Sequence, residues 1–291
     1  MAGGRPARAH HACRSDVVLC LSLARRPHLA RAHRPAVHSF WQHLRSLNAA
    51  FDLVVSPGAS LSRRLAAGGL EKVVTIPLGV QPGVFRPALA RPELRREMLD
   101  RLALPDDCVI LVGVGRFAAE KRWPMVIRAA ASVATQRPVG LLLIGAGKGR
   151  NKLIREAARS PHVVVGQPNS DRAELAALLA SADALVHGCE SETFCLVASE
   201  ARASGLPIIV PDRGGAFDQL SPGAGLAYHA ADERALAEAI VTFHDTPGAF
   251  SRSVLASTRV RTMDGHFWYL MGHYERLAGS NILPRRPALA G

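Results

Sequence analysis

Short apolar runs alternate with helix-length segments over residues 105–243, and this alternation restricts the chain to very few folds. The first run, Cys108–Val114, is almost wholly apolar, as expected of a parallel strand that is covered by helices on both faces. Strands that alternate with helices of this length indicate right-handed βαβ units, because parallel strands need a crossover connection. The sequence therefore predicts an α/β fold with one complete Rossmann-like domain built on a doubly wound parallel sheet. We expect further strands at Leu141–Ile144, His162–Val165, Ala184–His187 and Pro207–Val210, and helices at Trp123–Ala134, Asn151–Ala158, Asp171–Ala180 and Glu233–Phe243.

The segments on either side of this domain are less regular. Residues 1–35 carry many Arg, His and Pro without a clear period, so we expect a basic, irregular arm. A helix, a strand and a second helix are expected between Ser39 and Ala67, followed by a strand at Val73–Ile76 and a Pro-rich linker. An aromatic helix is expected at Asp264–Leu277, and its wide apolar face must pack on another element. The expected divisions are the arm at 1–35, a truncated N-terminal Rossmann-like remnant with its linker at 36–88, the complete domain at 89–245, and C-terminal helices at 246–291 that pack back toward the N-terminal part.

The net charge of +12 raises the question of a nucleic-acid or anionic-membrane partner. Of the 36 basic residues only four are lysines, and such an Arg bias is what a GC-rich genome gives without selection for binding. Residues 1–50 hold eight Arg and one acid, a net 8 − 1 = +7, so peripheral contact with an anionic membrane stays open beside a poorly ordered arm. No apolar run approaches the roughly 18 residues of a membrane span, and no signal peptide is convincing. We therefore expect a cytoplasmic location, or a peripheral one at the inner face of the membrane, and no nucleic-acid partner.

The stretch Glu192–Glu200 follows the fourth expected strand and leads into an amphipathic helix. Open α/β sheets bind ligands at this kind of junction, beyond the carboxyl ends of the strands. Thr193 is the expected cap of the helix, which leaves the backbone N–H groups of Phe194, Cys195 and Leu196 facing any anion above the strand. The pattern therefore indicates a site for a pyrophosphate, as in a nucleotide sugar.

The two carboxylates of this stretch fit the same ligand. Glu200 is expected about two turns into the helix, where an ionised carboxylate can accept hydrogen bonds from both hydroxyls of a ribose. Glu192, still in the loop, can do the same for a sugar ring. The ordinary alternative is that both are solvated surface glutamates, which are common on helices.

A glycine turn with two cations closes the first strand of the domain, at Gly113–Lys121. Gly115 permits a close backbone approach to a phosphate, while Arg116 supplies a guanidinium fork and Lys121 a point charge. An ordinary turn with two solvated basic residues is the alternative. Lys121 favours the functional interpretation, because lysine is rare in this chain.

Further glycine turns follow the next strands. Gly145–Arg150 fails as a dinucleotide fingerprint because Arg150 stands where a glycine is needed, and it fails as a P-loop as well. Gly145 and Gly166 are expected at strand ends, where backbone groups can recognise the base of a nucleotide. Gly214 and Gly215 form another turn at the same edge, with a simple loop as the alternative.

Cysteine usage gives no disulfide or metal pattern. The five cysteines form no CxxC pair and their number is odd, so we expect buried thiols. His187, Cys189 and Cys195 are close in sequence, but their spacing matches no standard zinc site. We expect no metal and no other cofactor.

Taken together, the blocks resemble one family. Residues 192–207, Glu-Thr-Phe-Cys-Leu-Val-Ala-Ser-Glu-Ala-Arg-Ala-Ser-Gly-Leu-Pro, resemble the Glu-x7-Glu signature of the retaining glycosyltransferases of family 4, the glycosyl transferases group 1. The block Gly115-Arg116 with Lys121 resembles the donor loop of that family, Ile76–Val80 its Ile-Pro-x-Gly-Val near the linker, and Gly214-Gly215 its late glycine turn. The resemblance covers roughly residues 50–280.

This resemblance implies a two-domain GT-B architecture that holds a nucleotide sugar mainly on the second domain. In that family the positions matching Arg116 and Lys121 stabilise the departing diphosphate, the position matching Glu200 binds the ribose, and that of Glu192 contacts the donor sugar. The expected function is transfer of a hexose from GDP- or UDP-hexose to the hydroxyl of a glycan or lipid-linked acceptor, with retention of configuration. The Glu-Thr-Phe-Cys run also resembles mannosyltransferase members.

The sequence departs from the family pattern in two ways. Thr193 and Cys195 stand where many members have glycine, which implies a different backbone approach at this point. Fewer than 80 residues precede the linker, and neither the Gly-rich loop nor the histidine of the family's first domain can be mapped onto the six histidines before residue 50. A catalytically incomplete nucleotide-sugar-binding module, or a shortened gene product that needs a partner for the acceptor domain, is therefore the alternative.

Overall fold

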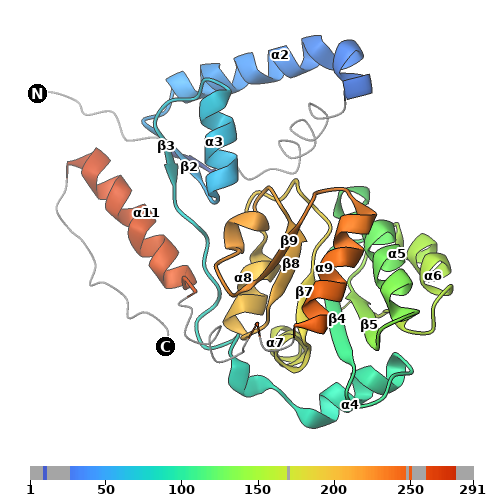
Figure 1. Ribbon diagram of the computed structural model, residues 1–291. Helices are drawn as coiled ribbons and strands as arrows, with labels where there is room; N and C mark the ends of the chain where they lie inside the picture. Colours follow the sequence, from blue (N-terminus) through green and yellow to red (C-terminus); the bar gives the residue numbers. More distant parts are fainter. Residues whose placement is uncertain (1–8, 12–26, 169–170, 247–248, 251–259, 280–291) are drawn as a thin grey trace, which may run out of the picture.

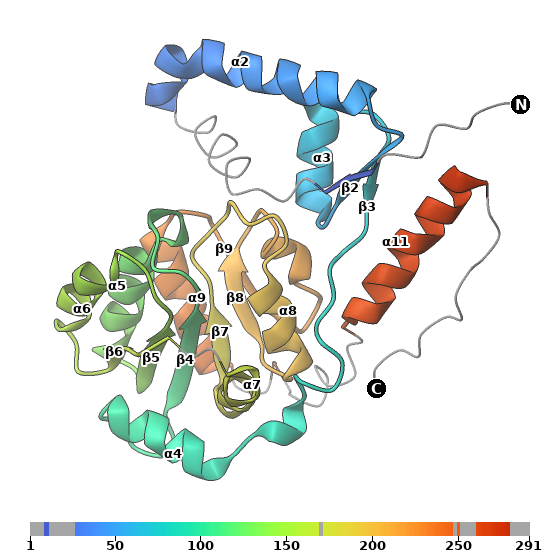
Figure 2. The ribbon, with the colours of Figure 1, turned by 180° about the vertical axis from the view of Figure 1, so that it is seen from behind.

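The structure is a computed structural model that describes residues 9–11, 27–168, 171–246, 249–250 and 260–279. A larger α/β domain lies below a smaller part with its own strands and helices (Figure 1). One extended segment carries the chain from the smaller part to the larger domain, along the side of the molecule on which the C-terminal helix lies (Figures 1 and 2).

Six parallel strands form the sheet of the larger domain, in the order β6-β5-β4-β7-β8-β9. The chain starts in the middle at β4, moves outward to β6 and then crosses back to β7, so the winding direction reverses between β4 and β7. This is the strand order of doubly wound dinucleotide-binding sheets, and the predicted fold class is confirmed. The strands are β4 (Val109–Val114), β5 (Val139–Ile144), β6 (Val163–Val165), β7 (Ala184–Val186), β8 (Ile208–Pro211) and β9 (Gly225–Tyr228).

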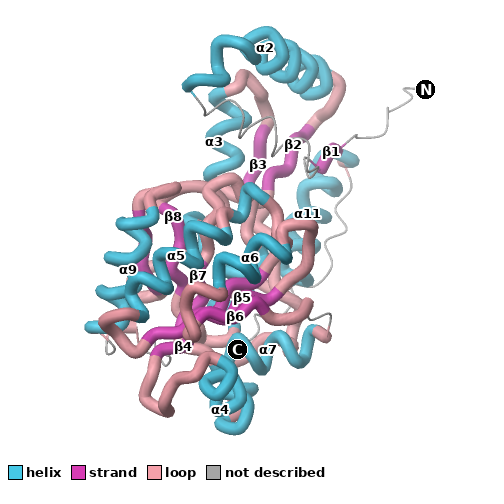
Figure 3. Tube along the Cα trace, turned by 90° about the vertical axis from the view of Figure 1, so that its right-hand side faces the viewer, coloured by secondary structure: helices cyan, strands magenta, loops and turns pink. Residues whose placement is uncertain are grey.

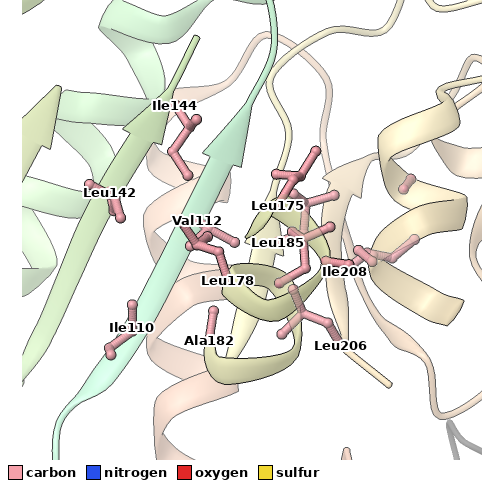
Figure 4. Close-up of a cluster of buried hydrophobic side chains, with 14 of the residues drawn as sticks. Ile110, Val112, Leu142, Ile144, Leu175, Leu178, Ala182, Leu185, Leu206 and Ile208 are labelled. Carbon is pink, nitrogen blue, oxygen red and sulfur yellow. The ribbon is translucent and has the colours of Figure 1, made fainter. Parts of the chain in front are cut away.

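Helices cover both faces of this sheet because successive strand residues point to opposite sides. Ile110 and Val112 of β4 belong to the hydrophobic cluster that includes α7, as Figure 4 shows, whereas Leu111 belongs to the cluster on the other face. Fully burying one such side chain stabilises the fold by about 1.5–3 kcal/mol, which makes the two clusters its main support. The first face carries α4 (Pro92–Arg101), α7 (Arg172–Ser181) and α8 (Leu196–Ala203), and the second α5 (Trp123–Ala134), α6 (Arg150–Ala157) and α9 (Glu233–Asp245).

The smaller part is built on a three-stranded parallel sheet in which β2 (Leu53–Ser56) pairs with β1 (Ala9–His11) and β3 (Val73–Thr75). Helix α3 (Ala59–Ala67) buries Leu61 and Leu65 against Val54 of β2 and against side chains from the C-terminal half of α2 (Pro27–Ala49). Figure 3 shows α2 crossing the end of this part.

The prediction of an irregular arm over residues 1–35 is wrong in two places. Ala9–His11 forms the edge strand β1, and α2 begins at Pro27 instead of Ser39. Pro suits the first turn of a helix, and the Ala, Leu and Arg that follow are good helix formers, which explains the earlier start. Residues 1–8 and 12–26 lie outside the described residues.

The C-terminal helix α11 (Met263–Ala278) returns to the smaller part. Leu270 is 5% exposed and packs with Leu53, Val55 and Ile76 of the three-stranded sheet and its flank. Just before the helix, Val80 N–H donates to Arg261 O and Met263 N–H donates to Val80 O, each at 2.9 Å. The linker and the segment leading into α11 are thus fixed side by side.

Two elements of the larger domain are absent from the sequence prediction. Helix α4 begins at Pro92, just past the expected linker boundary at residue 88, because proline fits the first helical position. Strand β9 is a short edge strand whose Gly-Leu-Ala-Tyr run has no clear period. No helix in the described ranges is both long and apolar enough to cross a bilayer.

Candidate functional site

The candidate site lies where the winding of the large sheet reverses, beyond the carboxyl ends of β4 and β7. The loop after β4 leads through a 3-10 turn, η2 (Ala119–Lys121), into α5, and the loop after β7 leads to α8. Because β4 and β7 are neighbours, side chains that are 71 residues apart in sequence meet here. Open α/β sheets bind their ligands at this position.

A buried ion pair joins the two loops. The Lys121 ammonium contacts Glu192 Oε1, and the two side chains are 14% and 19% exposed. His187 at the end of β7 is 1% exposed, and its Nε2 lies 3.1 Å from the same oxygen, outside good hydrogen-bond geometry. The His187 backbone is held by Ile209 O and by the Tyr228 hydroxyl, which donates to His187 O at 2.8 Å.

These contacts set the charges of the three groups. Burial raises the pKa of the Glu192 carboxyl, but the His187 contact and the Lys121 ammonium outweigh it and hold the pKa at about 2. Burial lowers the pKa of Lys121, yet Glu192 reverses the effect and the net shift is upward. Burial also lowers the pKa of His187. At neutral pH the site therefore contains a charged Lys121, a charged Glu192 and a neutral His187.

The start of α8 differs from the expectation. Thr193 is not the cap: Cys195 is the N-cap residue, with φ 68° and ψ 71° in the left-handed region, and no side chain caps the helix. The N–H groups of Leu196 and Val197 begin the first turn, where helix geometry leaves backbone donors without an intrahelical acceptor. Phe194 is 4% exposed, and its carbonyl accepts from Gln219 Nε2 at 3.0 Å. The anion-facing donors predicted for this stretch thus begin at Leu196.

The glycine turn after β8 supports the loop that carries Glu192. Gly215 N–H donates to Glu192 O at 2.9 Å. A Cβ at Gly214, which has φ +88°, would lie 2.1 Å from Glu190 O, and one at Gly215 would lie 2.5 Å from Phe194 N. Both positions need glycine for close backbone contact, so the turn is more than a simple loop.

Glu200 lies in α8, closer to its start than expected. It is the fifth helical residue, just over one turn in, and its side chain is 4% exposed. Its Oε1 accepts a hydrogen bond from Arg172 Nη2 at 2.7 Å, a contact that the sequence analysis does not contain. Both glutamates of the Glu-x7-Glu spacing are therefore paired and largely buried, which corrects the alternative of solvated surface groups.

Arg116 lies on the loop between β4 and η2, directly after Gly115. Its side chain is 71% exposed, and Nη2 donates to Glu120 Oε1 at 3.1 Å. The Arg116 carbonyl accepts from the indole of Trp123 at 2.8 Å, which fixes the loop backbone while leaving the guanidinium in solvent. An exposed cation on the same loop as the largely buried Lys121 suits a ligand whose charge lies at the surface of the crevice.

The glycines predicted for base recognition lie on the neighbouring strands. Gly115 N–H donates to Ile144 O, and a Cβ at Gly145 would lie 1.9 Å from Gly115 O, so the loops after β4 and β5 touch at that point. Gly166 follows β6, where its N–H donates to Leu143 O at 2.7 Å. The predicted residues therefore line one sheet edge in the order Gly166, Gly145, Gly115 and Glu192.

A cleft of about 210 Å³ lies between this site and the smaller part of the molecule. Its lining includes Arg63 and Arg64 of α3, Glu192 and Thr193 of the loop after β7, and Arg213 after β8. The approach of the two parts is close, because a Cβ at Gly58 would lie 2.5 Å from Thr193 O. A molecule in this cleft would therefore lie beside Glu192.

His187, Glu192 and Cys195 bring potential metal-ligand atoms within 4.8 Å of one another. Burial raises the pKa of the Cys195 thiol, which therefore keeps its proton at neutral pH. The Lys121 ammonium already occupies the Glu192 carboxylate. A cation would have to displace both the proton and the ammonium, so these residues do not fit a metal as they stand.

Three features of the site are missing from the sequence analysis. From the sequence, His187 is interpreted only as a potential metal ligand. Arg122 has φ +52° at the start of α5 and forms a two-fold contact with Glu190, with Nε to Oε2 at 2.9 Å. Arg172 pairs with Glu200. The partners of Arg122 and Arg172 lie 68 and 28 residues away in sequence, so no local spacing could reveal these two contacts.

Comparisons with known proteins point to one family. The family model "Glycosyl transferases group 1" matches residues 95–252. A GDP-mannose-dependent alpha-mannosyltransferase of Mycobacterium tuberculosis is 34% identical over 246 residues, which cover 82% of this chain and 60% of the relative. A GDP-mannose-dependent monoacylated alpha-(1-6)-phosphatidylinositol monomannoside mannosyltransferase of Corynebacterium glutamicum is 27% identical, covering 84% and 65%.

Among solved structures, sucrose-phosphate synthase from Thermosynechococcus elongatus superposes with a TM-score of 0.73 at 22% identity, over 93% of this chain and 68% of that one. This likeness supports the GT-B fold. The chain spans 60% and 65% of the length of these two curated relatives. Because the family model covers more than half of the sequence, the chain belongs to the glycosyl transferases group 1.

Proposed function

We propose that this protein transfers a mannose from GDP-mannose to an acceptor hydroxyl with retention of configuration. The observation that carries the proposal is the meeting of Lys121, Glu192 and the start of α8 at the point where the sheet winding reverses. The 34% identity to a GDP-mannose-dependent mannosyltransferase supports the choice of base and sugar. A UDP-hexose is the other donor that the sequence analysis leaves open.

Charge development on the leaving group explains how these residues would act. When the bond between sugar and diphosphate breaks, the nucleoside diphosphate gains negative charge, so fixed cations and helix N–H groups aimed at it lower the barrier. Lys121, Arg116 and the N–H groups of Leu196 and Val197 are the donors placed for this task. Their stabilisation requires no metal.

The two glutamates would hold the donor on either side of the diphosphate. Glu200 would accept from the ribose hydroxyls, and Glu192 from a hydroxyl of the sugar. Burial in a preformed crevice means that neither carboxylate must reorganise when the donor arrives. Glu192 is engaged by Lys121 and is not proposed as a nucleophile. The acceptor oxygen would instead bond to the anomeric carbon on the face from which the diphosphate leaves, as the bond between sugar and diphosphate breaks and the hydroxyl proton passes to a phosphate oxygen, which gives retention.

The cleft beside Glu192 is the proposed acceptor site. Its cationic lining by Arg63, Arg64 and Arg213 and the name of the Corynebacterium relative support a glycan or lipid-linked acceptor. Action from the cytoplasm, at the inner face of the membrane, is part of the same proposal.

The test is turnover of GDP-mannose, with GDP-glucose and UDP-glucose as competitors for the assignment of base and sugar. We expect release of GDP, and a product whose anomer, read by proton NMR before mutarotation, matches that of the donor. Arg116→Ala should slow release at least tenfold, because removal of one charge-stabilising donor typically lowers the rate by about 10²–10³. Arg234→Ala on α9, an 87% exposed side chain, is the control. An inverted product, or equal release by both variants, would refute the mechanism.

A donor-binding module without transfer is the second candidate, favoured by the limited coverage of the relatives. It predicts that GDP-mannose binds in equimolar amount and is released unchanged. Hydrolysis of the donor by the chain alone decides against it.

A further inference from the structure

Arg172 lies at the first residue of α7 and contacts a residue of the proposed donor site. Its Nη2 donates to Glu200 Oε1 at 2.7 Å, and its guanidinium carbon lies 4.8 Å from the centre of the Phe85 ring. The Glu200 side chain is 4% exposed and that of Arg172 is 46% exposed. The pair thus joins a buried carboxylate to a guanidinium that is open to solvent on one side.

Three separate elements hold this arginine in place. The Asp171 carboxylate caps α7 by accepting from Ala173 N–H at 2.8 Å, which fixes the backbone beside Arg172. Phe85, 6% exposed, belongs to the linker and to the same hydrophobic cluster as α7 and α8. Stacking of an arginine on an aromatic face restricts the orientation of its planar fork. Few orientations of the guanidinium then satisfy both Phe85 and Glu200.

We infer that Arg172 is a positioning residue that sets the Glu200 carboxylate for the ribose of the donor. This inference rests on the proposed function. A carboxylate offers about four acceptor positions, so a single donor from Arg172 to Oε1 leaves room for two ribose hydroxyls. The arginine fixes the rotation of the carboxylate before the nucleotide binds. Because Phe85 lies in the linker, the same contact connects the ribose site to the segment between the two parts of the molecule.

A purely structural role would have a different signature. If Arg172 only compensated a buried charge, its loss would destabilise the fold and weaken every nucleotide alike. If it positions Glu200, its loss weakens only those nucleotides that offer the hydroxyls. Comparison of GDP with 2′-deoxy-GDP separates the two roles.

The experiment is calorimetric titration of the full chain with GDP and with 2′-deoxy-GDP, for wild type, Arg172→Ala, Arg172→Lys and the control Arg234→Ala. Wild type should prefer GDP by about tenfold, the typical effect of one hydrogen bond to a charged group. In Arg172→Ala, GDP should lose about tenfold in affinity while 2′-deoxy-GDP changes little, so the preference falls toward one. Arg172→Lys keeps the charge but not the fork, and an intermediate preference is expected. Arg234→Ala should match wild type.

Thermal unfolding of each variant identifies a folding failure, and Arg172→Lys then decides alone. An unchanged preference in a folded variant, an equal loss for both nucleotides, or tighter GDP binding in Arg172→Ala would each overturn the inference. Wild type that binds neither nucleotide would overturn the proposed function as well. Wild type that binds both equally would overturn only the ribose contact and the inference built on it.

Discussion

Lys121 and Glu192 share one buried contact, so neither can be removed without leaving the other charge behind. Breaking a buried ion pair on one side typically costs about 3–5 kcal/mol of folding free energy. Arg116 differs because its side chain is 71% exposed and pairs at the surface with Glu120. Two cations proposed for the same chemistry should therefore differ sharply in their effect on stability.

Lys121→Ala should lower the free energy of unfolding by about 3 kcal/mol, whereas Arg116→Ala should change it by less than about 0.5 kcal/mol. Both should slow the release of GDP from GDP-mannose. Urea unfolding at pH 7, combined with turnover assays, measures the two effects separately. Equal stability losses in the two variants would contradict the buried pair.

Glu192 also predicts a pH dependence. Its pKa falls from 4.5 to about 2 in the folded chain, so the carboxylate contributes stability above pH 4.5, and this stability is lost as the pH falls from 4.5 toward 2. The shift corresponds to roughly 3 kcal/mol. Glu192→Gln should thus be less stable than wild type at pH 7, and the gap should narrow at pH 3. It should not close, because Lys121 remains charged without its partner. Urea unfolding of both proteins at pH 7 and pH 3 measures the gap, and an equal gap would contradict the assignment.

The sequence predicts the chemistry of this site better than its contacts. Lys121, Glu192 and Glu200 can be recognised from the sequence because each lies a short, fixed distance from a predicted strand or helix. Arg172 and His187 cannot be recognised in this way. Arg172 pairs with Glu200 of α8, and the His187 backbone bonds to residues of β8 and β9. The helix begins later than the cap predicted at Thr193, with Cys195 in the left-handed region, and the loop before it packs closely on the turn at Gly214 and Gly215, a contact that local sequence does not show.

At the scale of elements, α3 has a cap that comes from the larger domain. Asp218, in the 3-10 turn η3 (Phe217–Gln219), accepts from Ser60 N–H at 2.8 Å and from the Ser60 hydroxyl at 2.7 Å. Asp218 lies 158 residues from Ser60 in sequence. A helix N-terminus favours a carboxylate through its free N–H groups and its dipole. The cap therefore also joins the two parts beside the cleft.

Asp218→Ala should lower stability by about 0.5–2 kcal/mol and speed amide exchange at the start of α3. Asp218→Asn keeps one acceptor oxygen and should have a smaller effect. Asp106→Ala is the matched control, since Asp106 forms an exposed pair with Arg96. Hydrogen exchange by mass spectrometry reads the peptides of α3 directly. If the amides at the start of α3 exchange as slowly in Asp218→Ala as in wild type, the capping role is contradicted.

Element prediction succeeds where the apolar period is long and fails at edges. The helix at Trp123–Ala134 is predicted to the residue, because its buried face repeats over three turns. The sequence does not predict strand β9, because an edge strand needs no apolar run. It does not predict α4 either, because a proline such as Pro92 is as common in a linker as at the start of a helix. Helix α2 starts early because helix propensity overrides the lack of a clear period.

At the scale of the whole molecule, α11 ties the C-terminal segment to the smaller part. Leu270 is buried at 5% exposure among residues of the three-stranded sheet and its flank, while the neighbouring Met271 is 45% exposed. Leu270→Ala should cost about 2–5 kcal/mol and Met271→Ala less than about 0.5 kcal/mol. Urea unfolding of the pair measures the difference. Similar losses would show that the packing of α11 contributes little.

The central claim is that the crevice at Lys121, Glu192 and Glu200 holds a nucleoside diphosphate, and calorimetric titration with GDP tests it most directly. Wild type and Arg234→Ala should bind one GDP per chain with equal affinity, more tightly than UDP. Lys121→Ala and Glu200→Ala should each weaken GDP binding by at least about tenfold, as expected for the loss of one charge-assisted contact. Absence of GDP and UDP binding in wild type, or GDP affinities that neither substitution changes, would contradict the claim.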